Sequence, residues 1–243
     1  MCYNYSTMIK NDDILERGTP IGKGRILLED NTLVRLYRTN NDPFVNLRME
    51  KHNIRVTSKL DFIEKVYYFS QESGRKESYL IKDASKFQKG NKEHIKLVAD
   101  TLKKLHHAGI KFKYKYNAIS RLKYYRKYTD FSPWSKEDKD LLKEVKEIYS
   151  RYPLVPCHNN PNDKNILFKD GEAYLYNIEE AGMNIALFDL AFFIDHHDLS
   201  ENDIALLYKQ YGNINEKDAD VMRRFLGIYS KYQDKYINDV IEG

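Results

Sequence analysis

The sequence of 243 residues lacks the features that mark membrane proteins, secreted proteins and proteins stabilised by a structural metal. It contains no apolar run long enough for a transmembrane helix, and its first residues lack a signal-peptide core, so we expect a cytoplasmic protein without a membrane partner. Its two cysteines, Cys2 and Cys157, are too few for a disulfide framework, and no Cys/His spacing is typical of zinc. Repeats, low-complexity tracts and interdomain linkers are also absent. This length then allows one two-lobed domain or two small ones.

The charge balance says little about a partner. Lys and Arg number 40 against 36 Asp and Glu, and the net charge of +4 is too small by itself to indicate nucleic-acid binding. A hydrophobic content of 42% is enough for a real core. The composition therefore predicts a globular chain whose function has to be sought in local motifs.

The strongest functional signal lies between residues 157 and 191. A polar stretch over 157–165 precedes an apolar run at 166–168, a turn signal at 169–171 and a second apolar run at 173–178. The two apolar runs predict a β-hairpin. Polar groups at the ends of adjacent strands point into one small space, so the hairpin predicts a metal and phosphate site. Its candidate groups are His158, Asn160, Asn165, Asn177 and Glu179.

This stretch resembles the choline/ethanolamine kinase and aminoglycoside phosphotransferase superfamily. The family pattern is His-x-Asp-x-x-x-x-Asn, a hairpin, Ile-Asp-x-Glu and then Asp-Leu-Ala. The Gly-Met-Asn and Phe-Asp-Leu-Ala ending is most similar to bacterial choline kinases. Four positions match the pattern as they stand: His158, Asn165, Glu179 and Asp189. Two do not, because Asn160 stands where the family has its catalytic Asp and Asn177 where it has its metal-binding Asp.

The resemblance implies a protein-kinase-like α+β fold in one kinase-like domain. Residues 1–83 would form a small β-rich nucleotide lobe, and residues 84–243 a larger, mainly helical lobe that carries the loop and its hairpin. ATP and Mg²⁺ are the cofactors that the family uses. His158 would brace the loop, and Asp189 would anchor it through hydrogen bonds to its backbone.

The two departures predict that the chemistry is lost while the scaffold remains. Asn160 cannot take up a proton, and loss of a general base typically costs about 100- to 10,000-fold in rate. Mg²⁺ prefers carboxylates, so Asn165, Asn177 and Glu179 would hold it weakly. We therefore expect an inactive or very slow pseudokinase that binds a nucleotide or a small cationic alcohol such as choline weakly, or acts through a protein partner. In the alternative, Glu179 and Asp163 substitute for the missing carboxylates in an active choline or aminoglycoside-type kinase.

The first third of the chain predicts the nucleotide-binding elements. The loop at 18–25 contains Gly22, Lys23 and Gly24 and is either a phosphate-binding turn or an ordinary one. A hairpin follows at 26–28 and 33–37, and strands at 62–69 and 78–81. By the resemblance, Arg35 replaces the family's phosphate-contacting Lys. Glu50, on a helix predicted over 44–60, either pairs with Arg35 or is solvated.

The remaining segments predict helices over 94–107, 187–194, 203–211 and 218–236, and one that begins after Ser135 and ends at 149. The stretch 111–127 interleaves basic residues with Tyr. It is either a solvated helix face with inward Tyr rings, which we favour, or a nucleic-acid-binding module that uses Lys113, Lys115 and Arg121. Aromatic residues of the closing helices are compatible with a choline cage or with a core. They are Tyr208, Tyr211, Phe225, Tyr229 and Tyr232, with Trp134 elsewhere.

Overall fold

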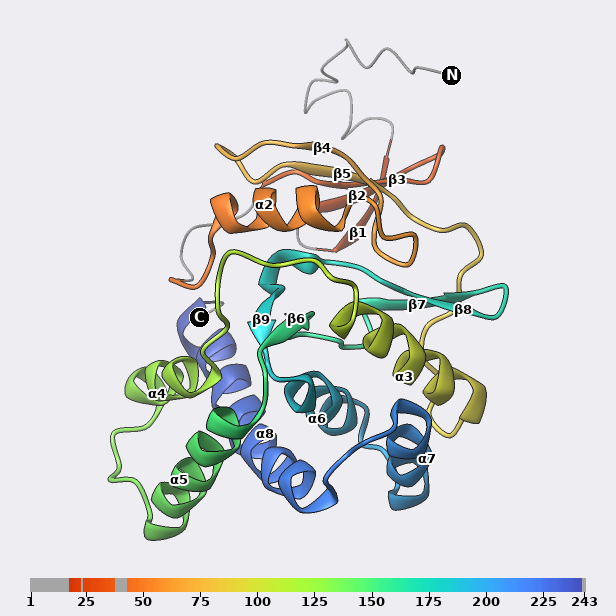
Figure 1. The fold of residues 1–243 in the computed structure, drawn as a ribbon. Helices are drawn as coiled ribbons and strands as arrows, with labels where there is room; N and C mark the ends of the chain where they lie inside the picture. The colour runs from red at the N-terminus through yellow and green to blue at the C-terminus, as the bar shows by residue number, and fades with distance from the viewer. Residues whose placement is uncertain (1–17, 23, 38–42, 242–243) are drawn as a thin grey trace.

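The computed structural model describes residues 18–22, 24–37 and 43–241, which form an N-terminal sheet region and a C-terminal helical region (Figure 1). The five strands of the sheet pair antiparallel in the order β1-β2-β3-β5-β4. They are β1 (Gly18–Gly22), β2 (Arg25–Leu28), β3 (Thr32–Arg35), β4 (Val66–Phe69) and β5 (Lys76–Tyr79). The mixed α+β fold predicted from the sequence is confirmed.

The prediction of a glycine-containing loop at 18–25 is mostly wrong. Gly18–Gly22 form the edge strand β1, so much of this backbone pairs with β2. An edge strand tolerates Pro20, because the missing N–H can face away from the ladder. Gly24 occupies the tight turn with φ +63°, which favours glycine. Lys23 lies outside the described residues.

Helix α2 (Leu47–Thr57) lies between the sheet and the helical region (Figure 1). It is shorter than the predicted 44–60, because Asn46 caps it by accepting a hydrogen bond from the Met49 N–H at 2.9 Å. The Asn53 amide donates to the carbonyls of Ile178 at 3.1 Å and Ala181 at 2.7 Å. The helix therefore ties the two regions of the chain together.

The C-terminal region contains α3 (Lys92–His106), α4 (Ala118–Thr129), α5 (Lys136–Arg151), α6 (Ala186–His197), α7 (Glu201–Tyr211), α8 (Glu216–Tyr236) and the π-helical turn η2 (Ile237–Ile241). The helices predicted there are confirmed within a few residues. Ser135 caps α5 by accepting from the Asp138 N–H, as predicted. One apolar cluster forms around α3 and α7, and a second where α4, α5 and α8 meet. No helix in the described part of the chain is long and apolar enough to cross a membrane.

Two short strand pairs position the polar stretch. The predicted hairpin is present as β7 (Ile166–Lys169) and β8 (Glu172–Leu175). Next to it, β6 (Val155–Cys157) pairs with β9 (Gly182–Asn184), and the 3-10 turn η1 (Ile178–Glu180) precedes β9. Because β6 enters the loop and β9 leaves the turn, residues 158–165 and 176–181 lie side by side.

The structure shows where the aromatic and basic residues of both pairs of alternatives lie. The five closing-helix aromatics pack in or against the two apolar clusters, as the core alternative required. In the stretch 111–127 a helix begins only at Ala118. Tyr116 and Tyr125 are buried, as the favoured alternative required, while Lys113 and Lys115 are exposed.

Candidate functional site

Asp189 holds the backbone of the polar loop at residues 158–165. Its Oδ2 accepts the His158 N–H at 2.8 Å, and its Oδ1 accepts the Asn159 N–H at 2.7 Å. The His158 ring bridges the loop to the hairpin, because its Nε2 lies 2.7 Å from the Tyr176 carbonyl oxygen. These are the contacts expected of a loop anchor and a loop brace. The roles of both residues in a reaction stay predictions.

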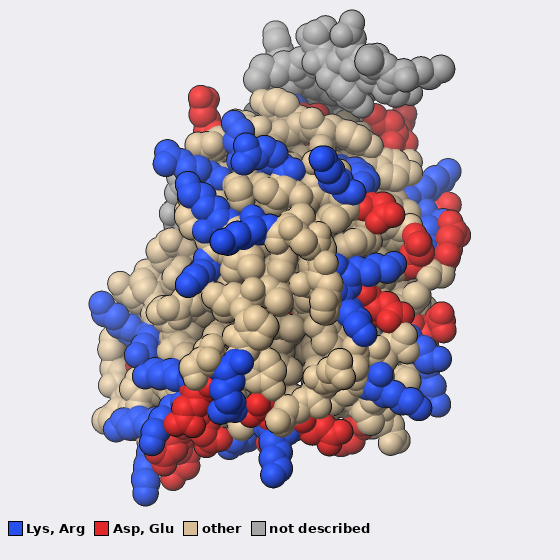
Figure 2. Space-filling view, in the orientation of Figure 1, with Lys and Arg blue, Asp and Glu red and all other residues tan. Residues whose placement is uncertain are grey.

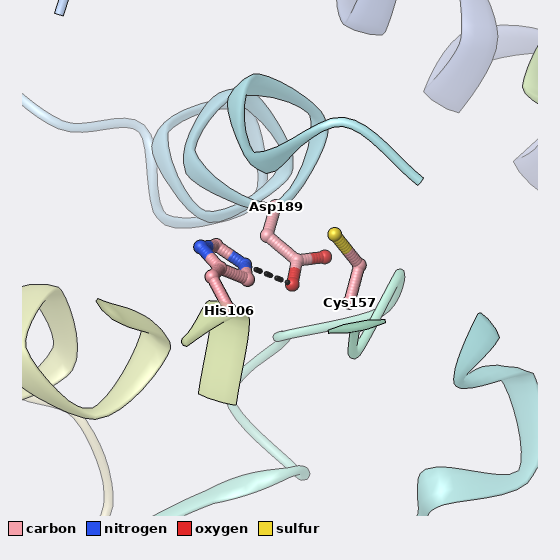
Figure 3. A group of neighbouring side chains, drawn as sticks. All are labelled: His106, Cys157 and Asp189. Atoms are coloured by element: carbon pink, nitrogen blue, oxygen red, sulfur yellow. Dashed lines mark hydrogen bonds and ion pairs between the residues drawn. The ribbon is translucent and has the colours of Figure 1, made fainter. Parts of the chain in front are cut away.

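His106, Cys157 and Asp189 converge at the base of this loop (Figure 3). They supply ligand types that suit a metal, but the His106 ring is engaged at both nitrogens. Its Nδ1 lies 2.8 Å from the Tyr211 hydroxyl and its Nε2 lies 3.1 Å from Asp189 Oδ2. Burial raises the pKa of Cys157, as does the nearby Asp189, so this sulfur remains a neutral thiol. The arrangement is that of a buried polar brace.

Three asparagines of the predicted site bond to one another. Asn165 donates to the Asn160 carbonyl at 2.8 Å, and Asn177 donates to the Asn165 side-chain oxygen at 2.6 Å. The Asn160 side-chain oxygen accepts from Asn162 at 2.8 Å. Asn177 has φ +55°, a left-handed conformation that Asn and Asp tolerate better than most residues. The amides thus form a chain in which each oxygen already has a donor or a cation beside it.

Arg35 reaches from β3 to the helix and to the turn after the hairpin. Its Nη2 lies 2.9 Å from Glu50 Oε2, and its Nη1 lies 2.8 Å from Glu179 Oε2. The guanidinium also donates to the Gly74 carbonyl at 2.7 and 2.9 Å. The Arg35–Glu50 pair is therefore present. Sequence reasoning did not anticipate that the same side chain would also bind Glu179.

A second cation, Lys76, lies directly opposite Arg35 in the register of β3 and β5. Its Nζ contacts Glu64 Oε2 at 2.8 Å and lies 3.4 Å from the Asn177 side-chain oxygen. Both members of the Lys76–Glu64 pair are buried, with side chains 3% and 0% exposed. Sequence reasoning missed this pair because the predicted strand began at Ser78. The polar alternation across residues 76–79 was the available signal.

These cations decide whether the site suits Mg²⁺. A hard divalent ion needs anionic oxygen ligands and space between them. Here the Asn165 oxygen is bonded to Asn177, the Asn177 oxygen faces the Lys76 ammonium, and Glu179 is paired with Arg35. The residues present do not fit a magnesium ion. The carboxylates of this region are already paired with side-chain cations, Glu179 with Arg35 and Glu64 with Lys76.

Asp163 points elsewhere. Its carboxylate lies 3.5 Å from His196 Nε2, and both side chains are nearly half exposed. It therefore bonds toward α6, whereas the asparagine chain runs toward β5. The sequence grouped Asp163 with Asn160 because they share a loop, but their side chains have different neighbours.

A pocket of about 180 Å³ adjoins the loop between α2, α4 and η1. The Arg121 guanidinium sits there between the rings of Phe44 and Tyr116, 4.5 and 4.2 Å from their centroids. It pairs with Glu180 Oε1 at 3.1 Å. Gly182 lets the backbone approach closely, since a Cβ there would lie 3.1 Å from the Tyr114 carbonyl. Arg121 had been grouped with exposed cations, and it is instead buried.

Removing the Lys76 charge is expected to destabilise the fold in a pH-dependent way. Burial alone would raise the pKa of Glu64, but the Lys76 ammonium and hydrogen bonds from Ser78 and the Asn177 N–H hold it below its usual value. The pair therefore stabilises the native state at neutral pH, and this contribution is lost as pH falls through the lowered pKa. Lys76→Met leaves a buried carboxylate unpaired and should cost about 3 kcal/mol at neutral pH.

In Lys76→Met the pKa of Glu64 should rise, because only the burial effect and hydrogen bonds remain. The penalty should therefore shrink as pH falls from neutral toward about 4, where the carboxyl is protonated in the unfolded state as well. Urea denaturation over this pH range measures the difference between the two proteins. Lys76→Met/Glu64→Gln should regain part of the loss at neutral pH. A penalty that does not vary with pH would contradict this assignment.

Comparison with known proteins places the chain in one family. A model of the choline/ethanolamine kinase family matches residues 25–242. Protein LicA of Haemophilus influenzae is 26% identical over 140 residues, which are 55% of this chain and 52% of that protein. An uncharacterized protein of Metamycoplasma hominis is 24% identical over 195 residues, 77% of this chain and 38% of that protein. The matches thus span about half or less of these relatives.

Solved structures agree in fold. The crystal structure of choline kinase LicA from Streptococcus pneumoniae superposes with a TM-score of 0.76 at 16% identity, covering 91% of this chain and 84% of that one. A gentamicin complex of an aminoglycoside phosphotransferase, APH(2")-IIa, gives a TM-score of 0.59 at 13% identity, covering 91% and 90%. The kinase-like fold predicted from the loop motif is confirmed. On the family match over nearly its whole length, the chain belongs to the choline/ethanolamine kinase family.

Proposed function

We propose that this chain is a catalytically impaired member of its family, which binds a nucleotide or small ligand without efficient phosphate transfer. The observation that carries the proposal is the side-chain environment of Asn177. This neutral amide faces the Lys76 ammonium at 3.4 Å and bonds to a second amide, Asn165. Phosphoryl transfer depends on an anionic metal ligand and a base for the acceptor hydroxyl. An amide supplies neither.

A nucleotide is the first ligand to test. Arg35 stands on β3 where the family has a phosphate-contacting Lys, and the turn at Gly22 and Gly24 lies on the same sheet. Arg35 is committed to Glu50 and Glu179, so a phosphate would have to compete with two carboxylates. Since Mg²⁺ does not fit the amides and cations around Asn177, we expect ATP to bind weakly and with little dependence on the metal.

A small cationic alcohol such as choline is the second ligand. Rings and a carboxylate are the groups that hold quaternary ammonium ions, and the pocket beside the loop offers Phe44, Tyr116 and Glu180. Arg121 already occupies the space between these rings and pairs with Glu180. Choline would have to displace a tethered guanidinium, which supports weak binding. A protein partner remains a third way for the fold to act.

The proposal is tested by single-turnover transfer of labelled phosphate from ATP to choline, with enzyme in excess and magnesium present. The expected result is no phosphocholine above the rate without protein, although ATP shifts the thermal unfolding midpoint in a concentration-dependent way. Rapid formation of phosphocholine would overturn the proposal. Glu179→Gln and Asp163→Asn would then show which carboxylate substitutes for the missing aspartates.

A further inference from the structure

A basic pocket of about 490 Å³ lies on the face of α2 that does not carry Glu50. Its cationic lining comes from Arg48, Lys51, His52, Arg55 and Lys113. No Asp or Glu of the described residues lines it. Figure 2 shows Lys and Arg gathered over the part of the surface where α2 lies in Figure 1, whereas both signs mix near the ends of α5 and α8. The pocket is thus a local concentration of positive charge on a nearly neutral protein.

Within the part of the chain that the structure describes, the cations of this pocket have no carboxylate partners. Among the described residues, no ion pair involves Arg48, Lys51, Arg55 or Lys113. Three arginines elsewhere on the surface are paired: Arg151–Asp218 at 2.6 Å, Arg223–Glu201 at 2.8 Å and Arg224–Glu144 at 3.1 Å. The same surface therefore neutralises its arginines in other places and leaves this group uncompensated.

The spacing of these cations along α2 lowers the stability of the helix. Lys51 and Arg55 are four residues apart, and like charges at this spacing destabilise a helix. The His52 Nε2 is also buried without a hydrogen-bond partner among the described residues. Unpaired cations beside an unsatisfied buried nitrogen indicate that an external group completes the site.

The lining also indicates the kind of ligand. Ile54, Phe69 and Tyr114 add apolar surface between the cations, and the volume suits a small molecule. Arginine forks bind phosphate oxygens through two parallel hydrogen bonds. We propose that this pocket binds a small phosphorylated molecule, with its phosphate on the α2 cations and its apolar body against Phe69 and Tyr114. The opposite face of the helix carries Glu50, so the α2 cations face away from the Arg35–Glu50 pair, although Tyr114 also lines the pocket considered for choline.

The concave shape of the pocket distinguishes between a small ligand and a large anionic partner. A membrane surface or a nucleic-acid strand would need cations that protrude on a broad face. Here the cations line a hollow and one ring nitrogen is buried, so an extended surface could not reach all of them at once. The geometry thus favours a compact phosphate ester.

Isothermal titration with phenyl phosphate tests the site on the full chain, with inorganic phosphate as the comparison ligand. We expect phenyl phosphate to bind more tightly than phosphate, and Arg48→Ala/Lys51→Ala/Arg55→Ala to weaken it about tenfold or more. The matched control is Lys139→Ala/Lys143→Ala/Lys146→Ala, which removes the same charge from exposed positions of α5. The control should bind like the parent.

Two results would overturn the proposal. The first is that phenyl phosphate does not bind, or that it binds equally well to the α2 and α5 variants. The second is binding of phosphatidylserine vesicles or single-stranded DNA that depends on the α2 cations while phenyl phosphate does not bind. Circular dichroism and the thermal midpoint show that each variant is folded. Transfer of phosphate to choline is not a readout here, so failure of this proposal is separate from failure of the previous one.

Discussion

Restoring both aspartates, in Asn160→Asp/Asn177→Asp, is expected to raise single-turnover transfer from ATP to choline by about 100-fold or more over the parent chain. The loop can accept the change because the Asn160 side-chain oxygen is already an acceptor, bonded to Asn162 at 2.8 Å. Position 177 can accept it as well. A carboxylate there keeps the tolerated left-handed φ of +55°. It gives up the hydrogen bond that the Asn177 amide donates to Asn165 and gains an ionic contact with Lys76.

The single variants are the controls for this experiment. Asn160→Asp alone should restore a base without the anionic metal ligand, and Asn177→Asp alone the reverse, so each should gain less than the double variant. Rapid-quench assays with labelled ATP measure all four proteins. If the double variant is folded, binds ATP and still transfers nothing, the two asparagines are not what disables the site. The Arg35–Glu179 pair would then be the next cause to test.

Removing the loop anchor, in Asp189→Ala, is expected to lower the free energy of unfolding by about 4–5 kcal/mol. The Asp189 side chain is fully buried and is the acceptor for two backbone N–H groups and for the His106 ring. Alanine leaves these donors buried without partners, and each orphan costs about 1–3 kcal/mol. Urea denaturation measures the loss, and an unchanged dependence of the unfolding free energy on urea concentration shows that unfolding stays two-state.

Two further variants make the result specific. Asp189→Asn keeps one acceptor oxygen and should lose less than the alanine variant. Asp140→Ala removes an exposed carboxylate from α5 and should change stability by no more than about 0.5 kcal/mol. A loss below about 1 kcal/mol in Asp189→Ala would mean that the loop N–H groups find other partners. Hydrogen exchange at the His158 and Asn159 amides would show whether they do.

The parts of the site that the sequence predicted lie within local motifs. His158 and Asp189 were expected to hold the loop, and their contacts to Tyr176 and to the loop backbone are present. The Arg35–Glu50 pair is present too. In these cases a short motif or a helix position fixes the partner, so its spacing along the chain carries the information.

The parts that were missed depend on pairing between distant segments. Lys76 faces Asn177 only because β5 joins the sheet beside β3, an order that residue spacing does not reveal. Arg121 was assigned to a solvated surface because its neighbours in sequence are basic. Its burial follows from packing against Phe44, nearly eighty positions earlier in the chain. Tertiary contacts of this kind override the local charge pattern.

The separation of the loop anchor from the altered residues bears on how this protein arose. Asp189 holds the loop backbone and is itself held by His106, while the Asn160 side chain bonds to Asn162 and to no other described residue. An Asp codon becomes an Asn codon by one change in its first base. If the chain is impaired as proposed, two base substitutions are enough to replace both aspartates, while the contacts that Asp189 makes to the loop backbone stay in place.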